Sequence, residues 1–235
     1  LLLPHTGTRM DTVVVGAGSW GTALACVLCR NSHRVTLWGR DADQLAHMAK
    51  ERRNQRYLPG LKLPESLQFT SDLAAAIAAL PKDAPSLIVT VVPSHTTRQV
   101  MGQVAHLIPP QAILVTASKG IENETLATMV EVLEQVLPAA LHDRIAVLSG
   151  PSFAGETIEQ HPTAVVVAAK DRQIAEAVQR AFQVGSFRVY TSDDVVGVEI
   201  GGAAKNVIAL ACGMADGLGF GHNTRAAVIT RGLAE

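Results

Sequence analysis

Short apolar runs alternate with amphipathic stretches through about the first 190 residues of the chain. The runs Val13–Val15, Leu87–Val92 and Ala112–Thr116 show almost no polar alternation, which is typical of parallel strands that are covered on both faces. Further strands are predicted at 34–38, near Gln68, and at 144–148, 164–168 and 187–190. Because these strands alternate with helices, the pattern predicts an α/β fold with a doubly wound, mostly parallel sheet.

Helices are expected between the strands, most clearly at 124–137 and 171–182. The other helices of this part are predicted at 19–30, 41–53 and 73–80. Ser94 is expected to cap the helix that follows Pro93. The segment 54–64 holds two prolines and a glycine, so we predict a loop there.

The pattern changes after Thr191. Residues 195–216 form one Gly/Ala-rich, mostly apolar segment, which we predict to be a single long helix, and no strand is expected after it. The sequence therefore divides into a sheet domain at 11–193 and the beginning of an all-α domain at 194–235. We expect the chain to stop inside this second domain, because it ends soon after a new apolar segment begins.

The length of this apolar helix raises the question of a membrane span. Glu199, Lys205 and Asn206 interrupt the helix, and each ionised group at a bilayer centre costs about 2.5–3.5 kcal/mol. We therefore expect a buried helix of a soluble protein and no membrane span.

The composition narrows the classes of function. A formal net charge of −1 gives no general attraction to nucleic acid or to anionic membranes. Three cysteines are too few for a disulfide framework, so a reducing, cytoplasmic setting is expected. Cys26 and Cys29 have CxxC spacing, but they lie in an apolar run with no second Cys/His pair to complete a ligand set. We interpret them as core residues and expect no metal site.

The segment from Gly16 to Gly21 reads Gly-Ala-Gly-Ser-Trp-Gly and matches G-x-G-x-x-G between a predicted strand and a predicted helix. Gly16 permits the tight turn, Gly18 lets the backbone approach a pyrophosphate, and Gly21 lets the helix lie close to the strand. The helix N-terminus offers unpaired N–H groups to the anion. We therefore predict a Rossmann-like site for NADPH or NADH; the structural alternative is an ordinary tight turn.

The end of the second predicted strand bears on the choice between NAD and NADP. An Asp or Glu there would accept the ribose hydroxyls of NAD. This chain has Trp38, Gly39 and Arg40 instead, and arginine is a good phosphate partner. NADP, or the use of both cofactors, is therefore favoured. The alternative is that Arg40 is a solvated residue paired with Asp43.

Two lysines are candidates for chemistry at an alcohol or ketone, which needs a group to manage the hydroxyl proton. Lys205 lies in the long helix among apolar neighbours, and Gly201 and Gly202, one turn earlier, leave room for a ligand. Lys119 follows the strand ending at Thr116, and ligands of open α/β sheets bind outside the carboxyl ends of the strands. A structural Lys–Glu pair and a solvated loop lysine are the respective alternatives.

Several stretches of the chain together resemble bacterial-type NAD(P)-dependent glycerol-3-phosphate dehydrogenases over essentially residues 11–235. These stretches are 16–25, 54–60, 92–94, 118–120, 149–154, 198–206 and 219–226. The resemblance implies that the second domain is a substrate domain and that the enzyme reduces dihydroxyacetone phosphate to sn-glycerol 3-phosphate with NAD(P)H, which supplies glycerophospholipid synthesis. The resemblance is compatible with a homodimer but does not establish one.

The resemblance also implies roles for individual residues. Beyond the glycines, it implies cofactor contacts at Ser19, Trp20, Arg40, Lys119 and Ala154. It implies substrate contacts at Lys119, Gly150, Ser152 and Lys205. Lys205 would be the proton donor and acceptor. The segment 149–156, with its small residues and hydroxyls, suits a loop that touches substrate and nicotinamide, although it is equally typical of a structural turn.

The chain departs from the family pattern in two ways. Ser32 and His222 stand where the pattern has Gly and Asp. The family also continues past this point with an Asp and a Ser-Arg-Asn stretch that grips the substrate phosphate. We therefore expect the 235-residue chain alone to bind dinucleotide but to turn over substrate negligibly.

Two alternatives of different class remain. Other two-domain dehydrogenases, such as those of 6-phosphogluconate or 3-hydroxyisobutyrate, follow the helix lysine with an asparagine at a spacing of four, whereas Lys205 and Asn206 are adjacent here. The second alternative is a non-catalytic NADP-binding module.

Overall fold

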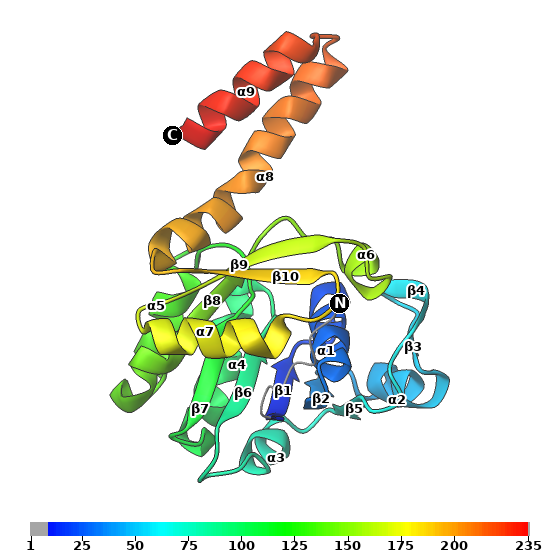
Figure 1. Cartoon of the computed structure of the whole chain (residues 1–235), viewed down its shortest axis with the longest axis vertical. Helices are drawn as coiled ribbons and strands as arrows, with labels where there is room; N and C mark the ends of the chain where they lie inside the picture. The colour runs from blue at the N-terminus through cyan, green and yellow to red at the C-terminus, as the bar shows by residue number, and fades with distance from the viewer. Residues whose placement is uncertain (1–8, 235) are drawn as a thin grey trace.

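Eight strands form one twisted sheet in the order β10-β9-β8-β7-β6-β1-β2-β5, as Figure 1 shows for a computed structural model that describes residues 9–234. Residues 1–8 and Glu235, the last position of the predicted second domain, lie outside the described residues. The strands are β1 (Asp11–Val15), β2 (Arg34–Trp38), β5 (Gln68–Thr70), β6 (Ser86–Thr90), β7 (Ala112–Thr116), β8 (Ile145–Ser149), β9 (Thr163–Ala169) and β10 (Phe187–Ser192).

The sheet is parallel except at one junction. β8 and β9 are antiparallel, with Ala146 paired to Ala169 and Ser149 to Val166, and β9 and β10 are parallel to each other. Every residue of β6, β7 and β8 is buried, as expected for strands covered on both faces. The prediction of an α/β, mostly parallel doubly wound sheet is confirmed.

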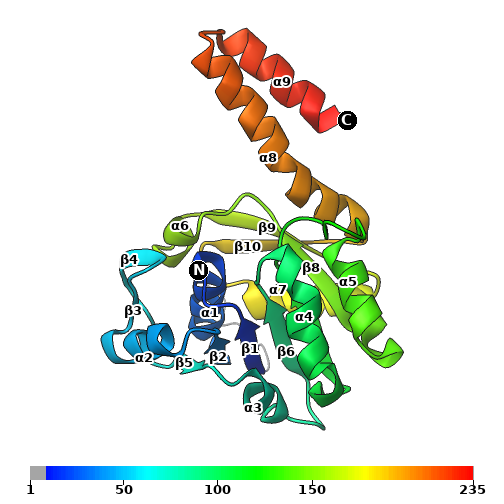
Figure 2. The ribbon, with the colours of Figure 1, turned by 180° about the vertical axis from the view of Figure 1, so that it is seen from behind.

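Helices cover both faces of the sheet. α1 (Ser19–Arg30), α6 (Ala154–Ile158) and α7 (Arg172–Phe182) lie on the face seen in Figure 1. α3 (Leu73–Ala78), α4 (Ser94–Val104) and α5 (Met129–Val136) cover the opposite face, where α4 and α5 are in front in Figure 2. Short 3-10 turns at Ala105–Leu107 and Ala139–Arg144 follow α4 and α5.

The side chains of the central strands alternate between two apolar cores. Val14 packs in the core with Leu24 and Phe182, whereas its neighbours Val13 and Val15 pack in the core on the other face. This alternation is the period of two that a strand imposes on its side chains. The two cores hold the eight strands and their covering helices in one layered body.

Three local predictions were wrong. The segment 54–64, predicted to be a loop, contributes to a small antiparallel pair of β3 (Arg53–Asn54) and β4 (Leu58–Lys62) that follows α2 (Ala42–Glu51). The helix predicted at 124–137 begins only at Met129, because Leu126 has a left-handed backbone with φ of 57° and Thr128 caps the helix. Pro93, not Ser94, occupies the cap position of α4.

Two helices project from the α/β body as an arm, which Figure 1 shows in orange and red. They are α8 (Val195–Gly217) and α9 (His222–Ala234). The prediction that α8 is buried was wrong: only Glu199 and Ala215 of this helix are buried, and Val207, Leu210 and Met214 are exposed. By length and composition α8 could cross a membrane, a test that many core helices of soluble proteins also pass.

The foot of α8 is attached to the α/β body by Glu199. Its Oε1 accepts a hydrogen bond of 2.9 Å from the backbone N–H of Val130, in the first turn of α5. The carboxyl thus lies at the positive end of a helix, where a negative charge is favoured. Burial nevertheless raises the pKa of Glu199, against the lowering effect of its hydrogen bonds with Val130, Thr128 and Met129.

His33, between α1 and β2, connects the residue before β1 to α7. Its Nδ1 accepts a 3.0 Å hydrogen bond from the N–H of Met10, just before β1, and its Nε2 lies 3.2 Å from the carbonyl of Ala181 in α7. The neutral ring with a proton on Nε2 satisfies both contacts. Burial lowers the pKa of His33 below its ordinary value of 6.5, and Arg9 lowers it further, while the bond to Ala181 raises it.

We predict that His33 makes the fold sensitive to mild acid. Because the folded-state pKa is lowered, the unfolded chain takes up a proton near pH 6.5 that the folded chain does not, so stability is lost as the pH falls below that value. Urea unfolding from pH 8 to pH 5 should give a steeper loss for the native chain than for His33→Gln. Equal pH slopes in the two proteins would contradict this role.

Candidate functional site

A cleft of about 920 Å³ opens at the carboxyl ends of the central strands. It is lined by the glycine loop after β1, the turn after β2, the residues after β6 and β7, and one side of α4 as far as Gln103. Of the predicted site residues, those that line this cleft are Gly16, Gly18, Ser19, Trp20, Gly21, Arg40, Lys119 and Ser152. The topology therefore brings most of the predicted site into one cavity.

The glycine loop is shaped by two close approaches. Gly16 has a φ of 128°, and a Cβ there would lie 2.6 Å from the carbonyl oxygen of Val91. A Cβ on Gly21 would lie 1.9 Å from the carbonyl oxygen of Gly16. No other residue fits at either position. A Cβ on Gly18, by contrast, would meet nothing within 4 Å, so this glycine leaves space open toward the cleft.

The N-terminus of α1 is available to a ligand. Its cap residue is Gly18, and no side chain caps the helix, so its first N–H groups have no side-chain partner. The indole N–H of Trp20, which also lines the cleft, is buried with no hydrogen-bond partner among residues 9–234. An open approach, free backbone donors and an orphaned indole N–H fit a phosphate-bearing dinucleotide.

Asn54 fixes the glycine loop from behind and was not singled out by the sequence analysis. Its buried amide donates to the carbonyl of Ala17 at 3.1 Å and to the hydroxyl of Thr22 at 2.9 Å. Gln44 donates to the same Ala17 carbonyl at 3.3 Å and to the Asn54 amide oxygen at 3.4 Å. The peptide before Gly18 is thus held by two amide side chains. Within the sequence, only the resemblance at 54–60 pointed to this segment.

Arg40 lies where the sequence placed it, at the rim of the cleft after β2. Its side chain is exposed, and no ion pair with Asp43 forms among the described residues. The nearby acid Asp41 instead caps α2 by accepting from the N–H of Gln44 at 3.0 Å. Arg40 is therefore free to face a ligand in the cleft.

Lys119 lies at the inner end of the cleft, half-buried. Its Nζ donates to the carbonyl of Gly150 at 3.0 Å and lies 6.0 Å from the centre of the Trp20 ring. Burial lowers the pKa of Lys119, and the charge of Lys205 lowers it further. Lys205, the other candidate lysine, is therefore near enough for its charge to affect Lys119.

Side-chain hydrogen bonds hold the loop that carries Lys119 on both sides of the lysine. Ser118 donates to the carbonyl of Val92 at 2.6 Å. Further along, Arg98 of α4 forms a bidentate pair with Glu122, at 2.9 and 2.7 Å. The Arg98 guanidinium and the Thr125 hydroxyl lower the pKa of Glu122 to about 2. These two interactions keep Lys119 at the cleft.

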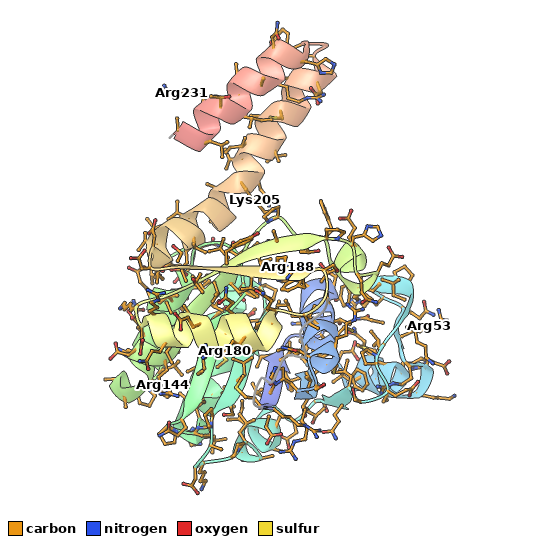
Figure 3. The ribbon with its side chains drawn as sticks, viewed as in Figure 1. Arg53, Arg144, Arg180, Arg188, Lys205 and Arg231 are labelled. Atoms are coloured by element: carbon orange, nitrogen blue, oxygen red, sulfur yellow. The ribbon has the colours of Figure 1, made fainter. Side chains whose placement is uncertain are left out.

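Lys205 lies on the exposed surface of α8, in the part of the arm nearest the sheet, as Figure 3 shows. It does not line the cleft, and the described residues include no hydrogen-bond or ion-pair partner for it. A Cβ on Gly202 would lie 2.5 Å from the hydroxyl of Ser149, so this glycine serves the packing of α8 on β8. Of these two glycines, Gly201 is the one that faces open space.

The segment after β8 has two different environments. The carbonyl of Gly150 accepts from Lys119 and from the hydroxyl of Ser152, the latter at 3.3 Å. Ala154, predicted as a cofactor contact, begins α6 and packs against the core beneath α1 rather than lining the cleft. Gly150 therefore orients Lys119, and Ser152 faces the cavity.

Cys26 is buried in the core, and Cys29, partly buried, packs against it. Burial raises the pKa of the Cys26 thiol to about 12, and burial also raises that of Cys29. Among residues 9–234 no group of three or more His, Cys, Asp or Glu side chains is arranged to hold a metal ion.

Comparisons with known proteins agree with the geometry of the cleft. The family model described as NAD-dependent glycerol-3-phosphate dehydrogenase N-terminus matches residues 11–175, and the corresponding C-terminus model matches 194–235. Glycerol-3-phosphate dehydrogenase [NAD(P)+] of Geobacter sp. (strain M21) is 51% identical over 222 residues, which are 94% of this chain and 65% of that protein. The same-named protein of Geobacter metallireducens is 54% identical with the same coverage. The chain thus spans about 65% of the length of these curated relatives.

Solved structures give the same result. The crystal structure of glycerol-3-phosphate dehydrogenase from Coxiella burnetii superposes with a TM-score of 0.85 at 37% identity, covering 96% of this chain and 67% of that one. The yeast glycerol-3-phosphate dehydrogenase superposes with a TM-score of 0.82 at 25% identity. The resemblance seen in the sequence is confirmed by these matches.

We predict that Asn54→Ala weakens both the fold and the cleft. The unfolding free energy should fall by about 1–3 kcal/mol, because the Ala17 carbonyl loses a buried donor. NADPH affinity should fall with it, because the peptide before Gly18 is no longer fixed. Urea unfolding and a fluorescence titration measure the two effects.

Asn31→Ala is the matched control, because Asn31 also donates to two carbonyls, those of Arg180 and Ala181, away from the cleft. Its NADPH affinity should equal that of the native chain. If Asn54→Ala destabilises the fold yet binds NADPH as the native chain does, Asn54 has no role in the site.

Proposed function

The chain belongs to the NAD-dependent glycerol-3-phosphate dehydrogenase family, and on that premise we propose that it binds NADPH or NADH and interconverts dihydroxyacetone phosphate and sn-glycerol 3-phosphate. The observation that carries the proposal is the cleft itself: Gly18 leaves open space before the uncapped N-terminus of α1, and Lys119 lines the same cavity. The reaction supplies glycerophospholipid synthesis, and the cytoplasm remains our expectation for where it occurs.

The cofactor half of the proposal rests on the first domain alone. The N–H groups at the start of α1 receive the pyrophosphate, and Gly18 leaves the space for it. The bound nicotinamide supplies or accepts the hydride at the substrate carbon. Ser152 and Lys119 line the same cleft and would contact the substrate there.

The substrate half of the proposal rests on two cations with different environments. Lys119 is half-buried and already directed by the Gly150 carbonyl, which suits it to hold an anionic substrate in one orientation. Lys205 is exposed on α8, one turn after Gly201, which faces open space. We propose that Lys205 gives a proton to the substrate oxygen on reduction and takes it back on oxidation.

The alternatives are weaker for stated reasons. For a hydroxy-acid dehydrogenase of another type, the Asn residue four positions after the lysine is absent, since Asn206 directly follows Lys205. A non-catalytic NADP-binding module would need neither lysine near the cleft. Because the chain covers about 65% of its relatives, the decisive assay uses the protein translated from the whole open reading frame that encodes it.

The proposed function makes one prediction about the choice of cofactor. The native chain should bind NADPH at least as tightly as NADH, because Arg40 stands where NAD-specific sites carry an acid. Arg40→Ala should weaken NADPH binding more than NADH binding. Fluorescence titrations with both nucleotides test this. A clear preference for NADH that Arg40→Ala does not alter would refute the assignment.

The second prediction concerns proton transfer. In the protein from the whole reading frame, Lys205→Ala should lower kcat by about 10²–10⁴-fold, the usual contribution of a general acid–base group, while NADPH affinity changes little. Lys50→Ala, which removes an exposed lysine of α2, is the control and should keep native kcat. If the native protein fails to oxidise NADPH with dihydroxyacetone phosphate, the proposed function is wrong. If the native protein is active and Lys205→Ala keeps the native kcat, the proton carrier is another group.

A further inference from the structure

The rim of the cleft carries a second arginine that the sequence analysis did not single out. Arg56 and Tyr57, in the turn between β3 and β4, both line the cleft beside Gly39, Arg40 and Asp41. The guanidinium carbon of Arg56 lies 5.3 Å from the centre of the Tyr57 ring. Two arginines from segments 16 residues apart in the sequence thus meet the same end of the cavity.

The acid nearest the end of β2 is Asp41, and both of its oxygens are engaged. Oδ1 accepts the N–H of Gln44 at the start of α2, and Oδ2 lies 3.6 Å from Nη1 of Arg56. An unopposed carboxylate at this place would repel a phosphate on the adenosine ribose. The helix N-terminus and Arg56 together offset that charge.

Stability does not account for the Asp41–Arg56 pair. Its side chains are 45% and 63% exposed, and ion pairs with this exposure contribute little to folding. Arginine does, however, bind phosphate with a planar fork of donors. An exposed guanidinium on the rim of a dinucleotide cleft, next to an acid that it neutralises, is better explained by a ligand than by the fold.

We propose that Arg56 is a specificity-determining residue for the 2′-phosphate of NADP(H), which it binds together with Arg40 while it neutralises Asp41. This inference rests on the proposed function, because it assumes that the cleft receives a dinucleotide. It adds the second half of a two-cation site, supplied by the β3–β4 turn. Asn54, at the start of that turn, is hydrogen-bonded to the glycine loop. The same segment would therefore shape the pyrophosphate site and bind the 2′-phosphate of the ribose.

The test compares Arg56→Ala with the native 235-residue chain in titrations with NADPH, NADH, 2′,5′-ADP and 5′-AMP. NADPH and 2′,5′-ADP affinity should fall about tenfold, as for loss of one hydrogen bond to a charged group. NADH and 5′-AMP affinity should change less than about threefold. The salt dependence of NADPH binding should also become shallower, because one phosphate contact is lost.

Arg53→Ala is the matched control. Arg53 begins the same hairpin and donates to the carbonyl of Gly60 at 3.0 Å, but it does not line the cleft. It removes the same charge from the same segment and should keep native affinity for both nucleotides. Asp41→Asn in the Arg56→Ala background retains a capping side chain and should restore only part of the lost NADPH affinity.

The outcomes separate the two proposals. If the native chain binds neither NADPH nor NADH, the proposed function fails. If it binds NADPH and Arg56→Ala weakens NADPH and NADH equally, or neither, the role of Arg56 in specificity is refuted. Full recovery with Asp41→Asn would also refute direct phosphate binding by Arg56. A loss confined to NADPH and 2′,5′-ADP supports the inference.

Discussion

The close approach of α1 to the turn after β1 is the constraint on which the cleft depends. The helix lies so near the turn that a single added carbon at Gly21 would overlap the Gly16 carbonyl, and one at Gly16 would overlap the Val91 carbonyl just after β6. Because the backbone fills this space, α1 points its N-terminus at the carboxyl edge of the sheet, where parallel strands place their ligands. Arg40 after β2, Lys119 after β7 and Ser152 after β8 take their positions from that edge. Arg56 reaches the cavity from the separate β3–β4 pair.

Sequence patterns predicted the parts of the fold that depend on local chemistry. Uninterrupted apolar runs gave the buried strands, and the glycine spacing gave the dinucleotide loop. The antiparallel direction of β9 was not predictable, because a strand has the same period of two in either direction. Asn54 and Arg56 were also missed as site residues. They lie in a short segment rich in proline and glycine, and their importance comes from contacts with residues distant in the sequence, such as Ala17 and Asp41.

The long apolar helix shows a different limit of sequence reasoning. Its composition correctly predicted one continuous helix, and it indicated burial, yet most of α8 is exposed. Hydropathy shows that removing an apolar surface from water lowers the free energy, but it does not say which segment covers that surface. The curated relatives are longer than this chain, which spans about 65% of their length. Lys205 shows the same limit, since its interaction with Lys119 depends on how α8 attaches to the sheet rather than on its neighbours in sequence.

That attachment gives α8 the mechanics of a lever. The helix is anchored at its foot, where Glu199 bonds to α5 and Gly202 packs on β8. At a rise of about 1.5 Å per residue, Lys205 lies only about 4.5 Å along the axis from Gly202, whereas Gly217 lies about 22 Å away. A small rotation about the foot therefore displaces the far end of the arm about five times as far as the lysine. A displacement at the tip of α8 would therefore move Lys205 only a little.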